Sequence, residues 1–388
     1  MTEARLPFRE FHLFAILNEY DDRRSPLDLF LSFYFRQNRA VGSKDRKEIC
    51  EAIYGMIRWK GLLDYLCKND PTWEERHSIY TSIDPLEYIK KNEIPLHTRL
   101  SFPKDLFDII SAAYGEREAQ NICLDSNVPA PTTIRANSLK TSRNSLLRAW
   151  DGKYEVSPCK ESDTAITFHK KINFFASPEF KKGLFEIQDE GSQLIANMVK
   201  AQPGQAIMDY CSGSGGKTLA FAPSMKNKGQ IYLHDIRPHI LLESRRRLRR
   251  AGIQNAQPIE AGSPKLKKLK KTMDWVLVDA PCSGSGTIRR NPDMKWKFDP
   301  KNLAELVGMQ KNIFEKALSY MKPGGKIVYA TCSIFPEENE EQVEHFLKTY
   351  PIEIVGKPFK CLPQKGGMDG FFGCTFQKKA AKPSNKLA

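Results

Sequence analysis

Apolar residues recur at helical spacing through the first third of the chain. After Ser43, a residue type that favours the N-cap position of a helix, they fall on one helical face. The residues that share this face are Ile49, Ile53, Met56 and Ile57. The stretch 105–114 has a similar pattern, and no strand pattern of comparable strength accompanies it. We therefore expect residues 1–125 to form an all-α domain.

Residues 126–200 combine strand and helix patterns. The stretch opens with PAPTTIRANSLK, a strand candidate bounded by prolines, and a helix pattern follows near 142–150. Two more strand candidates precede the helical pattern QDEGSQLIANMV. This size and order predict a small α+β module.

From residue 201 onward, short apolar strands alternate with helices. The strand candidates are 206–209, 230–235, 257–260, 274–279, 326–331 and 371–376. The longest helix pattern runs from about Asn302 to Met321 and ends at KPGG, a typical stop signal. The pattern predicts a doubly wound α/β domain over residues 201–380, followed by a basic tail at 381–388.

The composition excludes several classes of protein. No run approaches the roughly 18 apolar residues that a membrane span needs. Acids and arginines occupy MTEARLPFREFHLF, where a signal peptide needs an apolar core. The nine cysteines are widely spaced without CxxC, and the seven histidines show no paired spacing, which argues against a disulfide framework and a zinc site. We expect a soluble, cytoplasmic monomer without a metal.

Positive charge is concentrated in one part of the chain. The net charge is +14, and residues 236–272 hold eleven Lys or Arg against two acids. Such a stripe favours a polyanionic partner, most commonly nucleic acid. The alternative is a solvated helix whose buried side is formed by Leu241, Ser244, Leu248 and Ala251. Further basic residues in IRRNPDMKWK, which we expect to add to this charge, are Arg289, Arg290, Lys295 and Lys297.

A glycine-rich turn provides the first candidate site. In DYCSGSGGKT, a strand ending at Asp209 runs through three glycines into a helix, so backbone amides can approach a ligand. An NTP-binding P-loop would need glycine where Cys211 stands, and the GxGxxG pattern also fails. Asp235 ends the next strand, where a carboxylate can accept both hydroxyls of a ribose. Taken alone, Asp235 is more often a surface aspartate at a strand end; together with the loop, it favours the ribose role.

Two cysteines provide the second candidate site. VDAPCSGSGT presents Asp279 and Cys282 after one strand, and GGKIVYATCS presents Cys332 after another. Ligands of open α/β sheets bind at the carboxyl ends of the strands. Both thiols could therefore face one crevice.

Three motifs resemble those of the RNA (cytosine-5) methyltransferases of the Sun/RsmB family. They are DYCSGSGGKT, VDAPCSGSGTIRRNPDMKW and YATCSIFPEENEEQVEHFL, within a similarity that spans about 126–379. IRRNPDMKW is most similar to the bacterial small-subunit rRNA branch, and 43–58 resembles the NusB-like helical domain of that branch. The resemblance implies a Rossmann-like, seven-stranded class I methyltransferase sheet that uses S-adenosylmethionine, preceded by an RNA-recognition-like module. In that module Arg135 and Asn137 are candidates for the RNA side, and the alternative for both is the ordinary polarity of a strand surface.

The resemblance also implies the roles of individual residues. Cytosine C5 is a weak nucleophile, so a thiolate must first add at C6. The resemblance assigns this addition to Cys332, release of the product to Cys282, and contact with the cytosine to Asp279. Lys217 either orients Asp279 or the ligand, or is a solvated lysine of the first helical turn. The implied S-adenosylmethionine site comprises Cys211, Ser212, Gly213, Ser214, Gly215, Gly216, Lys217, Asp235 and Asp279.

The sequence departs from the family pattern in two places. Gly262 and Ser263 stand where the family carries a Gly-Asp pair for the adenine amino group, so Glu260, Ser263 or a backbone group must replace that acid. The N-terminal region is shorter than a full NusB-like domain and lacks a clear match beyond about residue 70.

The expected substrate is small-subunit rRNA, with tRNA as the alternative. A non-catalytic RNA-binding or ribosome-assembly protein on the same fold is the alternative of another class. An amino-methyltransferase is disfavoured, because DAPC stands where such enzymes carry [DN]PP[YF].

Overall fold

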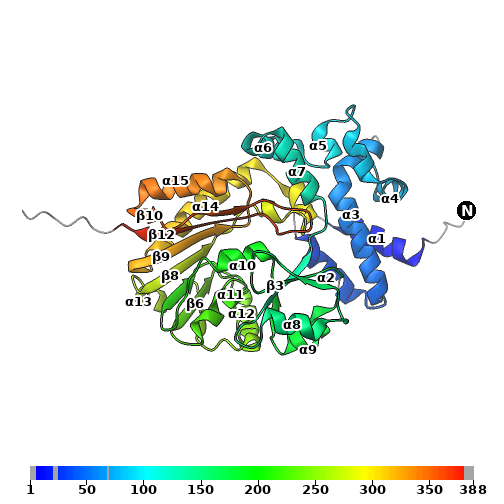
Figure 1. The fold of residues 1–388 in the computed structure, drawn as a ribbon. Helices are drawn as coiled ribbons and strands as arrows, with labels where there is room; N and C mark the ends of the chain where they lie inside the picture. Colours follow the sequence, from blue (N-terminus) through cyan, green and yellow to red (C-terminus); the bar gives the residue numbers. More distant parts are fainter. Residues whose placement is uncertain (1–5, 21–24, 68–69, 171, 380–388) are drawn as a thin grey trace, which may run out of the picture. The chain divides into compact units, whose positions relative to one another are not determined.

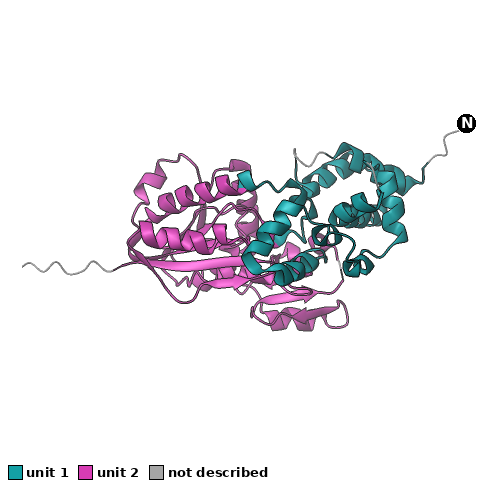
Figure 2. Cartoon of the chain, turned by 90° about the horizontal axis from the view of Figure 1, so that it is seen from above, with its two compact units in different colours: residues 1–129, 287–302 teal, residues 130–286, 303–388 magenta. Residues whose placement is uncertain are grey.

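The computed structural model describes residues 6–20, 25–67, 70–170 and 172–379 (Figure 1). The expected basic tail at 381–388 lies outside these residues. By its contacts the chain divides into two compact units (Figure 2). One comprises residues 1–129 together with 287–302, and the other comprises 130–286 and 303–388.

The first unit is helical, as its periodicity predicts. Its helices are α1 (Phe8–Glu19), α2 (Leu27–Gln37), α3 (Ser43–Cys67), α4 (Trp73–Ser82), α5 (Leu96–Arg99), α6 (Lys104–Tyr114) and α7 (Glu116–Ser126), with a 3-10 turn η1 (Pro85–Lys90). The long helix α3 begins at Ser43, and the four apolar residues expected on its inner face are all buried. Its centre packs in one core with the apolar sides of α1 and α2.

A segment distant in sequence completes this helical unit. The 3-10 turn η5 (Pro292–Lys297) places the Trp296 indole N–H 2.7 Å from the Ile57 carbonyl oxygen. Lys295 donates through Nζ to the Arg58 carbonyl oxygen at 2.6 Å and to Asn127 Oδ1 at 2.9 Å. Burial lowers the pKa of Lys295 well below its ordinary value.

This packing corrects one expectation about charge. Arg289 and Lys295 are only 2% and 1% exposed, so neither adds to a surface that meets RNA. The Lys295 ammonium is used inside the helical unit instead, and the Arg289 carbonyl oxygen accepts from Arg58 there.

The second unit begins with the expected α+β module. Its described strands are β1 (Thr132–Ala136), β2 (Val156–Pro158), β3 (Ala165–Phe168) and β4 (Phe185–Ile187), in the antiparallel order β2-β3-β1-β4. Its helices are α8 (Arg143–Trp150), the short α9 (Pro178–Lys181) and α10 (Glu190–Ala196). Trp150, Phe168 and Phe185 form the aromatic centre of its core. β4 lies at one edge of this sheet, and its Glu186 contacts Arg247 of the larger sheet domain.

The larger sheet has the topology expected for the fold class. Along its main path the described strands run β10-β12-β9-β8-β5-β6-β7, and β11 pairs with β12 at the side. The bounds are β5 (Ala206–Asp209), β6 (Gln230–Asp235), β7 (Ala256–Glu260), β8 (Met273–Asp279), β9 (Met321–Thr331), β10 (Ile352–Ile354), β11 (Phe359–Cys361) and β12 (Phe371–Lys378). β7, β6, β5, β8 and β9 are parallel, whereas β12 runs antiparallel to β9 and β10.

The helices of this sheet match the predicted alternation, with one difference at KPGG. They are α11 (Thr218–Phe221), α12 (Pro238–Ala251), α13 (Lys265–Lys268), α14 (Pro300–Leu318) and α15 (Glu340–Thr349). KPGG does not end α14, which finishes earlier; it lies inside β9, where the pairing with β8 shifts register. Gly324 there has a φ of 73°, a conformation that suits glycine at such an irregularity.

Candidate active site

The glycine-rich loop between β5 and α11 is held against the next strand. Gly213 and Gly215 have φ values of 50° and 82°, which favour glycine. A Cβ on Gly215 would lie 3.1 Å from the Leu233 side chain of β6. The Gly213 amide donates to Asp235 Oδ2 at 2.9 Å. The loop and the end of β6 therefore form one structure, as the proposed cofactor site requires.

Asp235 lies at the carboxyl end of β6 and is 4% exposed. Arg237 donates to its carboxylate through Nε and Nη2, at 2.9 and 3.0 Å. Burial alone would raise the pKa of Asp235, but these hydrogen bonds and that from Gly213 lower it below its ordinary value. Glu260 stands opposite Asp235 at the end of β7, so a second carboxylate reaches the same edge of the sheet.

Asp209 is a buried acid that sequence reasoning did not single out. It is 1% exposed at the end of β5, and its Oδ2 accepts from the Thr218 hydroxyl at 2.7 Å. Its Oδ1 has no hydrogen-bond partner among the described residues. Burial is the main reason that the pKa of Asp209 rises to about 7. Its sequence position, last in a strand before a glycine-rich turn, was the available signal.

The two cysteines expected to share a crevice are in contact. Cys282 Sγ lies 3.4 Å from Cys332 Sγ, and both are free thiols with half-buried side chains. They follow β8 and β9, which pair in parallel, with Asp279 opposite Ala330. Hydrogen bonding to Cys332 and burial raise the pKa of the Cys282 thiol well above its ordinary value. The Cys282 thiol therefore keeps its proton at pH values where an ordinary thiol begins to lose it.

Lys217 contacts Asp279 and is not a solvated lysine. Its Nζ lies 2.5 Å from Asp279 Oδ2, and its side chain is 11% exposed. Burial lowers the pKa of Lys217, but Asp279, together with the nearby Cys332, raises it above its ordinary value. The ammonium therefore lies where it stabilises negative charge on both Asp279 and Cys332.

A buried polar network holds the loop that carries Cys282. Glu338 is 0% exposed and accepts from the Ser283 amide at 2.9 Å and from the Ser283 hydroxyl at 2.5 Å. Gln310 Nε2 donates both to Glu338 at 2.9 Å and to the Pro281 carbonyl oxygen at 3.0 Å. Ser333, next to Cys332, bonds to Ser285 at 3.0 Å. These contacts fix the two cysteine loops relative to each other.

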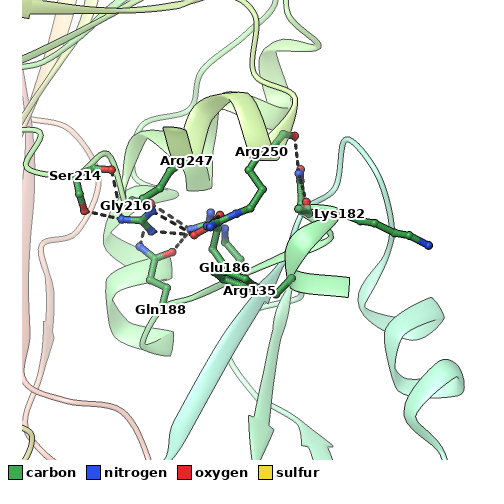
Figure 3. A network of polar contacts seen from close by, with 12 residues as sticks. Arg135, Lys182, Glu186, Gln188, Ser214, Gly216, Arg247 and Arg250 are labelled. Carbon is green, nitrogen blue, oxygen red and sulfur yellow. Dashed lines mark hydrogen bonds and ion pairs between the residues drawn. The ribbon is translucent and has the colours of Figure 1, made fainter. Parts of the chain in front are cut away.

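The α+β module also reaches the glycine-rich loop (Figure 3). Arg135 Nη1 donates to the Gly216 carbonyl oxygen at 3.2 Å and also contacts Gln188. Because Arg135 is 4% exposed, it is not on an RNA-facing surface, and that expectation is wrong. Asn137 is equally buried, and it donates to the Gly183 and Ala251 carbonyl oxygens at 2.9 and 2.8 Å. Both residues hold the module to the sheet domain.

Glu186 on β4 makes a second link between the module and the loop. Its carboxylate, 4% exposed, pairs with Arg247 at 3.0 Å and Arg250 at 2.5 Å (Figure 3). Arg247 also donates to the Ser214 hydroxyl at 2.6 Å. The buried stripe of α12 is the one predicted from its sequence, and the arginines that it leaves exposed are Arg245, Arg246 and Arg249.

The sheet order, the glycine-rich loop and the carboxylate at the end of β6 define a class I, S-adenosylmethionine-dependent methyltransferase. Residues 196–377 match the family 16S rRNA methyltransferase RsmB/F, and residues 102–174 match the ferredoxin-like domain of RsmF/B-like methyltransferases. Together with a relative that is 32% identical over 73% of this chain, these matches show that the chain belongs to the RsmB/F family, as its motifs predicted.

Two relatives illustrate the extent of the similarity. The "Probable ribosomal RNA small subunit methyltransferase B" of Bacillus subtilis is 32% identical, over 73% of this chain and 68% of that protein. The protein of the same name from Synechocystis is 29% identical, over 75% of this chain and 70% of its own length.

Two solved structures share the fold. A methyltransferase homologue from Pyrococcus horikoshii is 28% identical, covers 76% of this chain and 99% of its own, and has a TM-score of 0.64. The crystal structure of PH0851 covers 97% of this chain and 100% of its own with a TM-score of 0.80, and at 23% identity it supports the fold alone. Within the described ranges, no group of His, Cys, Asp or Glu is arranged to hold a metal, and no helix is long and apolar enough to cross a membrane.

Proposed function

We propose that this RNA methyltransferase forms 5-methylcytosine in small-subunit rRNA through a covalent bond between Cys332 and cytosine C6. The observation that carries the proposal is the contact between Cys282 and Cys332, at the carboxyl ends of neighbouring parallel strands and beside Lys217 and Asp279. The names of the relatives, ribosomal RNA small subunit methyltransferase B, support the choice of substrate.

The residues of the loop fit S-adenosylmethionine. The glycines leave backbone close to a ligand, and Asp235 and Glu260 offer carboxylates to its hydroxyl and amino groups. Ile236, 77% exposed beside Asp235, offers an apolar surface to a purine. Arg237, 53% exposed, must release part of Asp235 for a ribose to bind there. When bound, the cofactor supplies an electrophilic methyl group.

The thiolate of Cys332 begins the reaction by forming a bond to C6, which moves an electron pair toward C5. Asp279 contacts the N3 and N4 edge of the ring, and Lys217 offsets the added negative charge. C5 takes the methyl group, and the C5 proton then passes to water, so that the electron pair of the C5–H bond expels the Cys332 sulfur from C6. Cys282, in contact with Cys332, assists this release.

Two cysteine variants test the mechanism. We expect Cys332→Ala to abolish methyl transfer from labelled S-adenosylmethionine to small-subunit rRNA, because the thiolate that adds at C6 is then missing. Cys282→Ala should instead accumulate a protein–RNA adduct that survives denaturing electrophoresis. Normal turnover by Cys332→Ala would refute the assignment of the nucleophile.

The substrate is tested separately. Bisulfite sequencing of rRNA and tRNA from a deletion strain should show the loss of methylation at one position of small-subunit rRNA. Loss confined to a tRNA would favour the tRNA alternative. Unchanged methylation in both, together with an inactive purified protein, would favour the non-catalytic alternative.

A further inference from the structure

A cavity of about 240 Å³ lies within the second unit, between the edge strand β4 and α12. It adjoins the glycine-rich loop through Ser214, but neither Asp235 nor Asp279 lines it, so it is separate from the residues assigned to the ribose and the cytosine. The residues that line it are Phe175, Phe180, Glu186, Ile187, Ser214, Glu243, Arg247 and Arg250. A role for this cavity in holding the RNA substrate rests on the proposed function.

One wall of the cavity is aromatic and apolar, although it is open to solvent. Phe175 is 68% exposed and packs edge-on against Phe180, with ring centroids 5.1 Å apart. Ile187, at the end of β4, is 38% exposed. Exposed rings of this kind offer a flat face on which an unpaired base can stack.

Two arginines, Arg247 and Arg250, and two glutamates, Glu186 and Glu243, also line the cavity. The Arg250 guanidinium lies 3.9 Å from the centre of the Phe180 ring, and Glu186 holds both Arg250 and Arg247. Because Glu186 is buried, these guanidinium groups are fixed in place before any ligand arrives. A planar guanidinium and an aromatic ring beside one cavity are the usual partners of a nucleobase.

Exposed arginines elsewhere on α12 are suited to an RNA backbone. Arg246 is 82% exposed, and Arg245 and Arg249 share its exposed side of the helix. Phosphates attract such side chains, and they carry most of the affinity of proteins for nucleic acid. Arg246 is next to Arg247, which lines the cavity, so a strand bound at Arg246 would pass close to the cavity.

We propose that the cavity takes one unpaired base of the RNA substrate, stacked against Phe175, while the neighbouring phosphates lie along α12. The volume suits a single base and excludes a base pair within a duplex. Since Ser214 lines the cavity and also accepts from Arg247, the bound base would lie directly against the cofactor loop.

The test compares full-length variants that retain the fold. Phe175→Ala alters an exposed side chain, and Phe175→Trp keeps a stacking ring. Ile354→Ala, the control, removes an exposed apolar side chain from the edge strand β10 of the larger sheet. Fluorescence anisotropy would measure binding of a mixed-sequence single-stranded RNA, and of the same strand in a duplex, over a range of salt concentrations. Calorimetry would measure S-adenosylmethionine binding.

We expect Phe175→Ala to weaken single-strand binding by about 5- to 150-fold, the usual contribution of one stacked base. The salt dependence, duplex binding and cofactor affinity should stay unchanged, and Phe175→Trp and Ile354→Ala should bind like the wild type. Wild-type affinity in Phe175→Ala, or an equal loss on the duplex, would overturn the base site and leave the proposed function intact. Failure of the wild type to bind RNA at all would overturn both.

Discussion

The buried acid Asp209 should make the stability of the sheet domain fall as the pH rises. Its pKa is about 7 in the fold and 3.8 when unperturbed. Between these values the folded state holds a proton that the unfolded chain releases, so raising the pH favours unfolding. From pH 5 to pH 8 the loss amounts to about 3 kcal/mol, at 1.36 kcal/mol for each of the roughly two pH units between pH 5 and the pKa in the fold.

Asp209→Asn tests this linkage, because the amide has nearly the same shape and does not titrate. We expect the free energy of unfolding of this variant, minus that of the wild type, to increase by about 3 kcal/mol between pH 5 and pH 8. Urea denaturation at several pH values, followed by circular dichroism, would measure the difference. Contributions from distant titrating groups cancel in it.

A second aspartate of the same sheet domain provides the control. Asp274, at the start of β8, accepts from the Ala206 amide at 2.8 Å and pairs with Lys322. Burial raises its pKa, but the contact with Lys322 outweighs this and lowers it below 3.8. The carboxyl group of Asp274 is therefore ionised in both states above pH 5, and Asp274→Asn should differ from the wild type by a constant amount. A constant difference for Asp209→Asn as well would refute the burial argument.

Other changes have equally definite outcomes. Reversing the charges of Arg245, Arg246 and Arg249 should weaken RNA binding without altering cofactor binding in calorimetry. The slope of log affinity against log salt concentration should fall in magnitude by about 0.7 to 0.9 for each phosphate that the helix no longer binds. An unchanged slope would show that this side of the helix is only solvated. Gly286→Ala should cost about 1–3 kcal/mol in urea denaturation, because its Cβ would lie 2.3 Å from the Gly370 carbonyl oxygen; full stability would show that the backbone yields there. Because the pKa of Lys295 is lowered in the fold, the folded chain loses this proton at a lower pH than the unfolded chain does. Stability should therefore rise as the pH approaches 10.5. Lys295→Met should remove that rise in thermal denaturation.

Long or regular patterns were enough to predict most of the fold. β5 and β6 have the predicted bounds, and the stripe of α12 is buried at the predicted residues. The three-residue strands β10 and β11 were missed because so few residues show no periodicity. KPGG was misread because a proline and two glycines favour a helix stop, whereas here they accompany an irregular start of β9.

The residues of the candidate site that follow the ends of strands could be predicted from the sequence. Cys282 and Cys332 meet because β8 and β9 are parallel neighbours, which the order of the motifs allowed one to expect. The burial of Arg135, Asn137 and Lys295 was not predictable, because a single sequence does not say which polar side chains are enclosed by distant segments. In each case the partner is a backbone carbonyl group far along the chain.

The helical unit is discontinuous in sequence, and this has a consequence for its synthesis. Trp296 packs against its core, and the ribosome makes this residue roughly 170 residues after the first segment of the unit ends at Pro129. At 5–20 residues per second this is a delay of about 10 to 35 s. During that interval the N-terminal helices lack the segment that bonds to Ile57 and Asn127, although residues 130–286 of the second unit have already been translated. The first part of the chain to be made is thus among the last that can finish folding.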